Sequence, residues 1–389
     1  MGRMSTDVAP FKVAVPEEDL VDLRRRLAVA RWPEKEAVGD WSQGVPLEWL
    51  RDLCSYWGDG YDWRRCEDRL NAHDQFVTTI DGLDVHFLHV RSPNPDALPL
   101  LLTHGWPGSV LEFLDVIGPL TDPAAHGGDL ADAFHLVVPS LPGYGFSGRP
   151  AAAGWGVPRI AAAWATLMAR LGYDRYGAQG GDWGSAVTIG LTAADPDHLA
   201  GIHLNFVMTG PGGDLSELTD EEQDALTAMA EFLEWGSGYS ALQSTRPQTL
   251  GYALADSPVG QCAWIAEKFH AWTDHDGDPY TALSRDQMLD DISLYWLTAT
   301  AASSARLYWE SGLSRPSRAS GLAGGLDVRV PAGISVFPRE IIRLSRRWVE
   351  PSFSDLRFYE RADRGGHFAA YEQPAVFADQ VRRAFRTMR

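Results

Sequence analysis

The chain has 389 residues, which is long enough for one large α/β domain with an inserted cap or for two domains. Its 34 basic and 52 acidic residues give a formal net charge of −18, which argues against nucleic acid or an anionic membrane surface as a partner. Three cysteines, Cys54, Cys66 and Cys262, are too few for a disulfide framework, and no Cys/His cluster indicates a metal site. Without a signal-peptide pattern or a stretch of membrane-spanning length, we expect a cytoplasmic protein with reduced thiols.

Residues 1–75 are predicted to form an N-terminal helical arm that wraps the core. One helix begins at an acidic run at 16–19, which is followed by leucines at helical spacing. A second helix is predicted over 46–57. No residue in this arm indicates chemistry.

Residues 76–206 are predicted to form the first part of an α/β core. Strands at 75–80 and 83–90 are joined by the hairpin signal Asp81-Gly82. Further strands at 98–103 and 135–138 precede a helix at 157–171. Strands that alternate with helices predict a mostly parallel, doubly wound sheet.

Residues 207–325 are predicted to form an α-helical lid inserted between sheet strands. The helices expected there span 218–235, 260–272 and 287–309, and 314–325 reads as a flexible connection rich in Ser, Gly and Arg. The core resumes over 326–389 with strands at 333–337 and 356–359 and a closing helix from 374.

The segment 179–185, Gln-Gly-Gly-Asp-Trp-Gly-Ser, lies between a predicted strand at 173–178 and a predicted helix at 186–194. This pattern is typical of a nucleophile elbow, in which Gly180 and Gly184 permit the sharp turn. The exposed side chain would be Asp182, whose carboxylate can attack an electrophilic carbon without a base. The alternative for Asp182 is a helix cap in a glycine-rich loop.

The loop 104–107, His-Gly-Trp-Pro, follows a strand that would end beside the elbow. In such a fold this loop and the residue after the nucleophile supply the backbone N–H groups of an oxyanion hole. We assign these donors to Trp106 and Trp183; the alternative for the loop is an ordinary Trp-Pro-Gly turn.

His367 follows two glycines after the last predicted strand, where the order nucleophile, acid, histidine would place the base. Its acid partner is expected after the preceding strand, and Glu340 fits. Asp363 and Asp355 are competitors. Glu340 could otherwise be a surface carboxylate that starts a helix at 341–348.

Taken together, these motifs resemble the microsomal-type epoxide hydrolase family, including its N-terminal extension. The matching stretches span nearly the whole chain and are 104–109, 141–147, 179–184, 256–260, 267–269, 295–298, 308, 330–340 and 365–370. The resemblance implies Asp182 as nucleophile, Glu340 as acid and His367 as base. It also implies two lid tyrosines, Tyr308 and Tyr239, with Tyr280 and Tyr295 as the alternatives.

The activity implied by the resemblance is the opening of an epoxide to a vicinal diol through an ester on Asp182, with no metal or organic cofactor. A tyrosine hydroxyl would assist the departing oxygen, and His367 would activate the water that releases the product. The Trp-rich lid favours a bulky or aromatic epoxide as substrate. Similar relatives include enzymes of secondary metabolism. A homodimer is compatible with the sequence. Haloalkane dehalogenase and an inactive hydrolase-fold binding protein are the competing functions.

Overall fold

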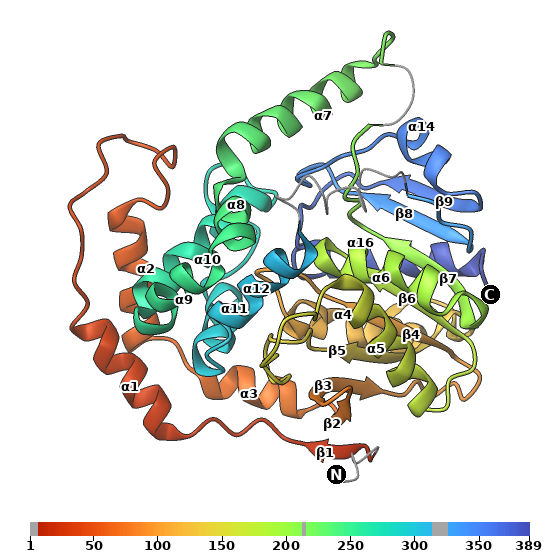
Figure 1. Cartoon of the computed structure of the whole chain (residues 1–389), viewed down its shortest axis with the longest axis horizontal. Helices are drawn as coiled ribbons and strands as arrows, with labels where there is room; N and C mark the ends of the chain where they lie inside the picture. The colour runs from red at the N-terminus through yellow and green to blue at the C-terminus, as the bar shows by residue number, and fades with distance from the viewer. Residues whose placement is uncertain (1–6, 212–214, 313–325) are drawn as a thin grey trace.

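The computed structural model describes residues 7–211, 215–312 and 326–389, and its core is a twisted sheet with helices on both faces (Figure 1). In the described residues the sheet has nine strands in the order β1-β2-β3-β5-β4-β6-β7-β8-β9. Strands β4 to β9 run parallel, whereas β1, β2 and β3 form an antiparallel edge. The strands are β1 (Ala9–Phe11), β2 (Gln75–Ile80), β3 (Leu83–Val90), β4 (Leu98–Thr103), β5 (Phe134–Pro139), β6 (Tyr176–Gly180), β7 (Leu199–Leu204), β8 (Ala332–Val336) and β9 (Leu356–Arg361).

The expected α/β-hydrolase sheet is confirmed, and β2, β3 and β4 have the predicted bounds. The strand before the elbow begins at Tyr176, later than predicted. Its predicted first residue, Tyr173, instead closes the preceding helix, because its N–H donates to the carbonyl of Met168 after Gly172 adopts a left-handed φ of 82°.

Among the described residues, the helices of the core are α4 (Leu114–Thr121), α5 (Val157–Arg170), α6 (Asp182–Ala194), α14 (Arg346–Val349), α15 (Ala369–Glu372) and α16 (Pro374–Arg386). The helix predicted at 341–348 is wrong over most of its length. Side-chain contacts hold this stretch as a loop, since Arg343 donates to the carbonyl of Pro338 and Tyr359 donates to the carbonyl of Leu344.

The lid is formed by helices between β7 and β8: α7 (Asp220–Glu231), α8 (Gly238–Thr245), α9 (Pro247–Asp256), α10 (Pro258–Trp272), α11 (Arg285–Leu297) and α12 (Ala301–Ser311). The single helix predicted at 287–309 is wrong, because the chain breaks into α11 and α12 at Ala299, which has a left-handed φ of 52°. Helices α8 and α9 were not predicted. The connection predicted at 314–325 lies outside the described residues.

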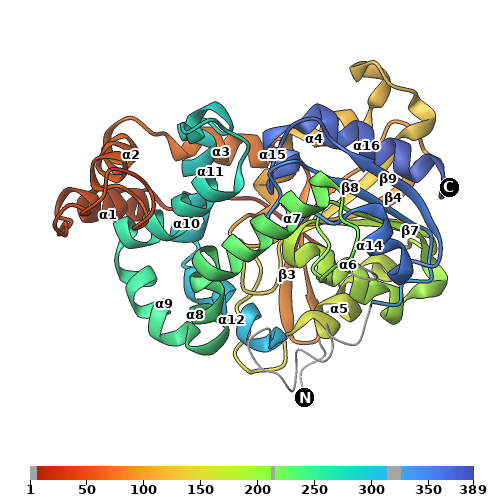
Figure 2. The ribbon, with the colours of Figure 1, turned by 90° about the horizontal axis from the view of Figure 1, so that it is seen from above.

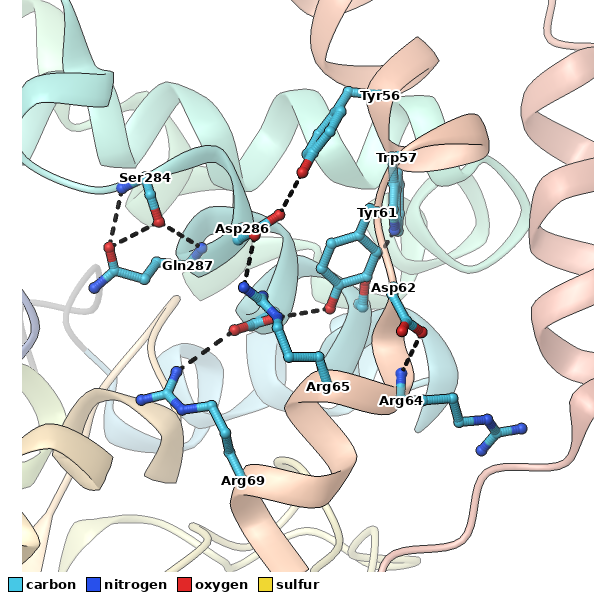
Figure 3. Close-up of polar contacts among 12 residues, drawn as sticks. Tyr56, Trp57, Tyr61, Asp62, Arg64, Arg65, Arg69, Ser284, Asp286 and Gln287 are labelled. Carbon is cyan, nitrogen blue, oxygen red and sulfur yellow. Dashed lines mark hydrogen bonds and ion pairs between the residues drawn. The ribbon is translucent and has the colours of Figure 1, made fainter.

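The N-terminal arm contains β1 and the helices α1 (Glu17–Ala28), α2 (Leu47–Asp59) and α3 (Trp63–Asn71). Figures 1 and 2 both show α1 and α2 beside the lid helices, on the side away from the sheet. Figure 3 shows polar contacts between the arm and α11: the Tyr56 hydroxyl donates to Asp286 at 2.8 Å, and Arg65 pairs with the same carboxylate. The arm helices therefore cover the lid, while β1 extends the edge of the core sheet. In the part of the chain that the structure describes, every helix is too short or too polar to cross a bilayer.

Candidate active site

Asp182 is the first residue of α6, on the sharp turn that follows β6, and has a left-handed φ of 47°. Such a backbone conformation is costly for a residue with a side chain and is typical of functional turns. The flanking glycines make the turn possible, because a Cβ on Gly180 would lie 2.2 Å from the carbonyl oxygen of Gly184, and one on Gly184 would lie 1.9 Å from that of Thr103. The geometry is that of a nucleophile elbow with a carboxylate at its tip.

The loop after β4 approaches this carboxylate from one side. The Trp106 backbone N–H donates to Asp182 Oδ1 at 2.7 Å. A Cβ on Gly105 would lie 2.2 Å from the same oxygen, so glycine is required for the approach. The Trp183 N–H belongs to the first turn of α6, where backbone donors have no acceptor within the helix. The two N–H groups predicted for an oxyanion hole thus flank the elbow.

His367 lies on the loop after β9 and joins Asp182 to Glu340. Its Nδ1 is 2.7 Å from Glu340 Oε1, and its Nε2 is 3.5 Å from Asp182 Oδ2. Burial alone would lower the pKa of the ring, but the negative charges of Glu340 and Asp182 outweigh it and hold the pKa well above its usual range. The competitors lie elsewhere: Asp363 is exposed, and Asp355 pairs with the neighbouring Arg357.

A buried carboxylate that the sequence analysis missed, Glu372, braces the histidine loop. It accepts hydrogen bonds from the backbone N–H groups of Gly366, Phe368 and Asp274 at 2.8–3.0 Å. Burial raises the pKa of Glu372 to about 7, although these three donors favour its charged form. Its position five residues after His367 was the only signal available in the sequence.

Tyr308 on α12 and Tyr239 on α8 converge above the elbow, with ring centroids 5.8 Å apart. The Trp106 indole stacks on Tyr239 at 5.0 Å and meets Tyr308 edge to face at 5.8 Å. The Tyr308 hydroxyl is buried and has no hydrogen-bond partner among the described residues. Burial, followed by the nearby Asp182 charge for Tyr239, raises the pKa of both phenols, so both are neutral donors at pH 7.

The two alternative tyrosines lie outside this convergence. The Tyr295 hydroxyl donates to the carbonyl of Gly108 at 2.8 Å, which commits it to holding the loop. Tyr280 stacks on Trp49 of the N-terminal arm with ring centroids 5.3 Å apart.

Lys268 is a second residue that sequence reasoning missed. Its side chain is buried on α10, pairs with Glu267, and places Nζ 4.3 Å from the centroid of the Tyr239 ring. Burial lowers the pKa of this ammonium, and the adjacent Glu267 opposes that change. Tyr239 is therefore held between a cation and an indole.

The site combines a carboxylate at an elbow, backbone donors, a carboxylate-oriented histidine and two neutral phenols. It can attack an electrophilic carbon, protonate a departing oxygen and activate water. Within residues 7–211, 215–312 and 326–389, no group of three or more His, Cys, Asp or Glu side chains is arranged to hold a metal ion. The fold and the order of these residues along the chain define an α/β hydrolase.

Comparison with known proteins specifies the class further. The model of the epoxide hydrolase N terminus matches residues 8–113, and the model of the alpha/beta hydrolase fold matches residues 99–296. A "Putative epoxide hydrolase" of Stigmatella aurantiaca is 58% identical over 98% of this chain and 86% of its own length. Epoxide hydrolase 1 of Sus scrofa is 36% identical over 97% of this chain and 88% of its own. The structure of Aspergillus niger epoxide hydrolase aligns with a TM-score of 0.88 and 33% identity over 99% of this chain and 98% of its own. The chain belongs to the epoxide hydrolase family.

Proposed function

We propose that the protein hydrolyses an epoxide in two steps through an alkyl ester on Asp182. The observation that carries the proposal is that the two carboxylate oxygens of Asp182 have different partners. Oδ1 accepts the Trp106 N–H at 2.7 Å, while Oδ2 faces His367 Nε2 at 3.5 Å. Oδ2 is the attacking oxygen, and Oδ1 becomes the ester carbonyl oxygen in the oxyanion hole.

In the first step Oδ2 forms a bond to one epoxide carbon, and the C–O bond of the strained ring breaks. The leaving oxygen carries negative charge as it departs, and the neutral phenols of Tyr308 and Tyr239 supply a hydrogen bond and a proton. The structural support is the proximity of the two rings, whose centroids are 5.8 Å apart, together with the unpartnered Tyr308 hydroxyl.

In the second step His367 removes a proton from water, which attacks the ester carbon. Esterification removes the charge of Asp182, one of the two negative charges that raise the pKa of His367. The ring therefore becomes easier to deprotonate once the ester has formed, while Glu340 still holds it in position. Collapse of the tetrahedral intermediate breaks the bond to the alkyl oxygen, which takes the proton from His367, and the diol leaves. The acid proton on Asp182 then returns to the phenolate formed in the first step, which restores both the carboxylate and the tyrosine.

The substrate class follows from the rings around the site. The Tyr308 ring contacts Trp106, Trp183 and Tyr239, and Tyr239 also stacks on Trp106, with ring centroids 4.8–5.8 Å apart. Trp272 contacts Tyr239 at 5.2 Å and His367 at 5.0 Å. Aromatic walls of this kind favour a flat apolar substituent. A bulky or aryl-substituted epoxide is therefore the proposed substrate class.

A single turnover in ¹⁸O-labelled water, with enzyme in excess over styrene oxide, tests the mechanism. We expect unlabelled diol and one labelled oxygen in the peptide that contains Asp182. A His367→Gln variant is expected to accumulate the ester as a mass adduct, and Asp182→Ala to form none. Label that enters the diol directly from solvent would rule out the ester.

One observation favours a second candidate, haloalkane dehalogenation. Trp183 follows Asp182 in the chain, and its buried indole N–H has no hydrogen-bond partner among the described residues, so it could bind a halide. The phenols favour the epoxide, because halide departure needs no proton. Parallel assays of diol formation and halide release from matched aryl substrates separate the two functions.

A further inference from the structure

A small cavity lies behind the nucleophile, on the side of the loop away from the lid tyrosines. Its volume is about 20 Å³, and its lining includes Asp182, His367 and Glu112, with apolar side chains such as Phe113 and Phe377 on the remaining walls. A single water needs about 10–15 Å³ and two or more polar partners. The cavity therefore has the size and the polar groups for one water, at the position where the ester would be attacked.

Glu112 is placed in this cavity by the loop that carries Trp106. A Cβ on Gly108 would lie 1.5 Å from Glu112 Oε1, so the carboxyl group lies directly against the loop, in space that glycine leaves free. Gly105 leaves similar space for the Asp182 carboxyl group, because a Cβ added at Gly105 would lie 2.5 Å from Asp182 Cγ. The carboxyl groups of Glu112 and Asp182 thus both line the cavity, the first beside Gly108 and the second beside Gly105.

The surroundings of the half-buried Glu112 favour its neutral form. Burial, followed by the charge of Asp291, raises the pKa of Glu112 well above its usual range, and the charge of Asp182 adds to this, although His367 opposes it. A neutral carboxyl group keeps a carbonyl oxygen that accepts a hydrogen bond, and it adds no negative charge beside the ester.

We propose that Glu112 is a positioning residue that holds the hydrolytic water in this cavity by accepting one of its hydrogens. The inference rests on the proposed ester on Asp182. The water's second hydrogen goes to His367 Nε2 as the new bond to Asp182 Cγ forms. When the bond between Cγ and the alkyl oxygen breaks, that oxygen takes the proton from Nε2. Glu112 keeps its own protonation state throughout.

The position of the cavity also bears on where the substrate binds. The lining includes neither Tyr239 nor Tyr308, so a water held in this cavity leaves the space beside the two phenols to the epoxide oxygen.

A size-matched pair of variants tests the assignment. Glu112→Gln keeps an acceptor oxygen, whereas Glu112→Met has similar volume and no comparable acceptor. With styrene oxide in single-turnover rapid quench, we expect ester formation within about threefold of the native rate in both. Ester decay should fall at least about tenfold in Glu112→Met only, the loss of roughly one hydrogen bond to the water. Asp115→Asn, an exposed change in the same segment, is the control and should leave both rates unchanged.

Other outcomes overturn the inference. Native decay in Glu112→Met would show that the water needs no such acceptor, and equal slowing in both variants would show that Glu112 acts through packing. Glu112→Leu gives the same apolar test if the methionine variant does not fold. If the native enzyme forms no adduct on Asp182, the proposed function itself fails; if it does and the variants decay normally, only the role of Glu112 fails.

Discussion

Removing the Tyr308 hydroxyl is expected to lower activity without lowering stability. This hydroxyl is buried and has no hydrogen-bond partner among the described residues. Burying an unsatisfied polar group costs about 1–3 kcal/mol, so Tyr308→Phe removes a penalty and loses no internal hydrogen bond. We expect the free energy of unfolding to stay the same or rise by about 1 kcal/mol.

The same substitution, Tyr308→Phe, should slow the opening of the epoxide ring. General acid catalysis contributes about 10²–10⁴-fold, and because Tyr239 remains beside the leaving oxygen, we expect a loss near the lower limit. Rapid-quench measurement of ester formation gives this rate, and urea denaturation gives the stability.

The control is the same substitution at Tyr295, whose hydroxyl donates to the carbonyl of Gly108 at 2.8 Å. Tyr295→Phe leaves that carbonyl unpaired and should lower the free energy of unfolding by about 1–2 kcal/mol. If Tyr308→Phe instead loses as much stability as Tyr295→Phe and opens the ring at the native rate, its hydroxyl is structural and our reasoning is wrong.

Three further predictions follow from buried charges. Burial raises the pKa of Asp291 to about 8 from its usual 3.8, so its contribution to stability is present below about pH 4 and is lost as pH rises through about 8. Asp291→Asn should remove this decline in denaturation curves recorded across that range. Arg65→Met should lower the free energy of unfolding, measured by urea denaturation, by about 2–3 kcal/mol, because it removes an ion-pair partner 2.9 Å from the buried Asp290. The exposed control, Arg24→Met, should lower it by less than about 1 kcal/mol. Lys268→Met removes the cation from the tyrosine face and should slow ester formation severalfold without changing ester decay, as rapid quench would show.

Much of the core could be predicted because local signals and the fold agree there. Apolar runs bounded by turn residues gave β2, β3 and β4 their limits, and the glycines around Asp182 are required by backbone contacts that almost any elbow would have. The candidate nucleophile and base follow strands, so their order along the chain predicted Asp182 and His367. The choice of Glu340 over Asp363 and Asp355 depended on the family resemblance.

The residues that were missed depend on contacts between distant segments. Glu112 reads as an acidic residue in a first helical turn, a common position with a local electrostatic explanation. Its other neighbours come from the elbow and the histidine loop. Similarly, Lys268 on a helix is usually a solvated charge, and only the arrangement of α8 against α10 buries it over Tyr239. The break at Ala299 has no Gly or Pro to signal it.

Helix α11 connects the loop beside the nucleophile to the rest of the lid. On one side, Asp291 accepts a hydrogen bond from the Ser109 hydroxyl at 2.6 Å, and Tyr295 donates to the carbonyl of Gly108. Both partners lie two or three residues after Trp106 in the chain, so the position of the Trp106 N–H depends on where α11 lies. A fixed donor is worth more to a developing oxyanion than a mobile one, because no reorganisation is needed during the reaction.

The other side of α11 is held by the N-terminal arm. The Trp57 indole donates to the Ser293 hydroxyl at 2.8 Å, and the Tyr61 hydroxyl donates to Asp290 at 2.8 Å (Figure 3). Without the arm, a buried carboxylate on α11 would lose its charge partners, and the apolar face of α10 would lose its cover. The arm therefore holds α11 and covers α10, the helices that carry Tyr295 and Lys268, and in this way it forms part of the active-site scaffold.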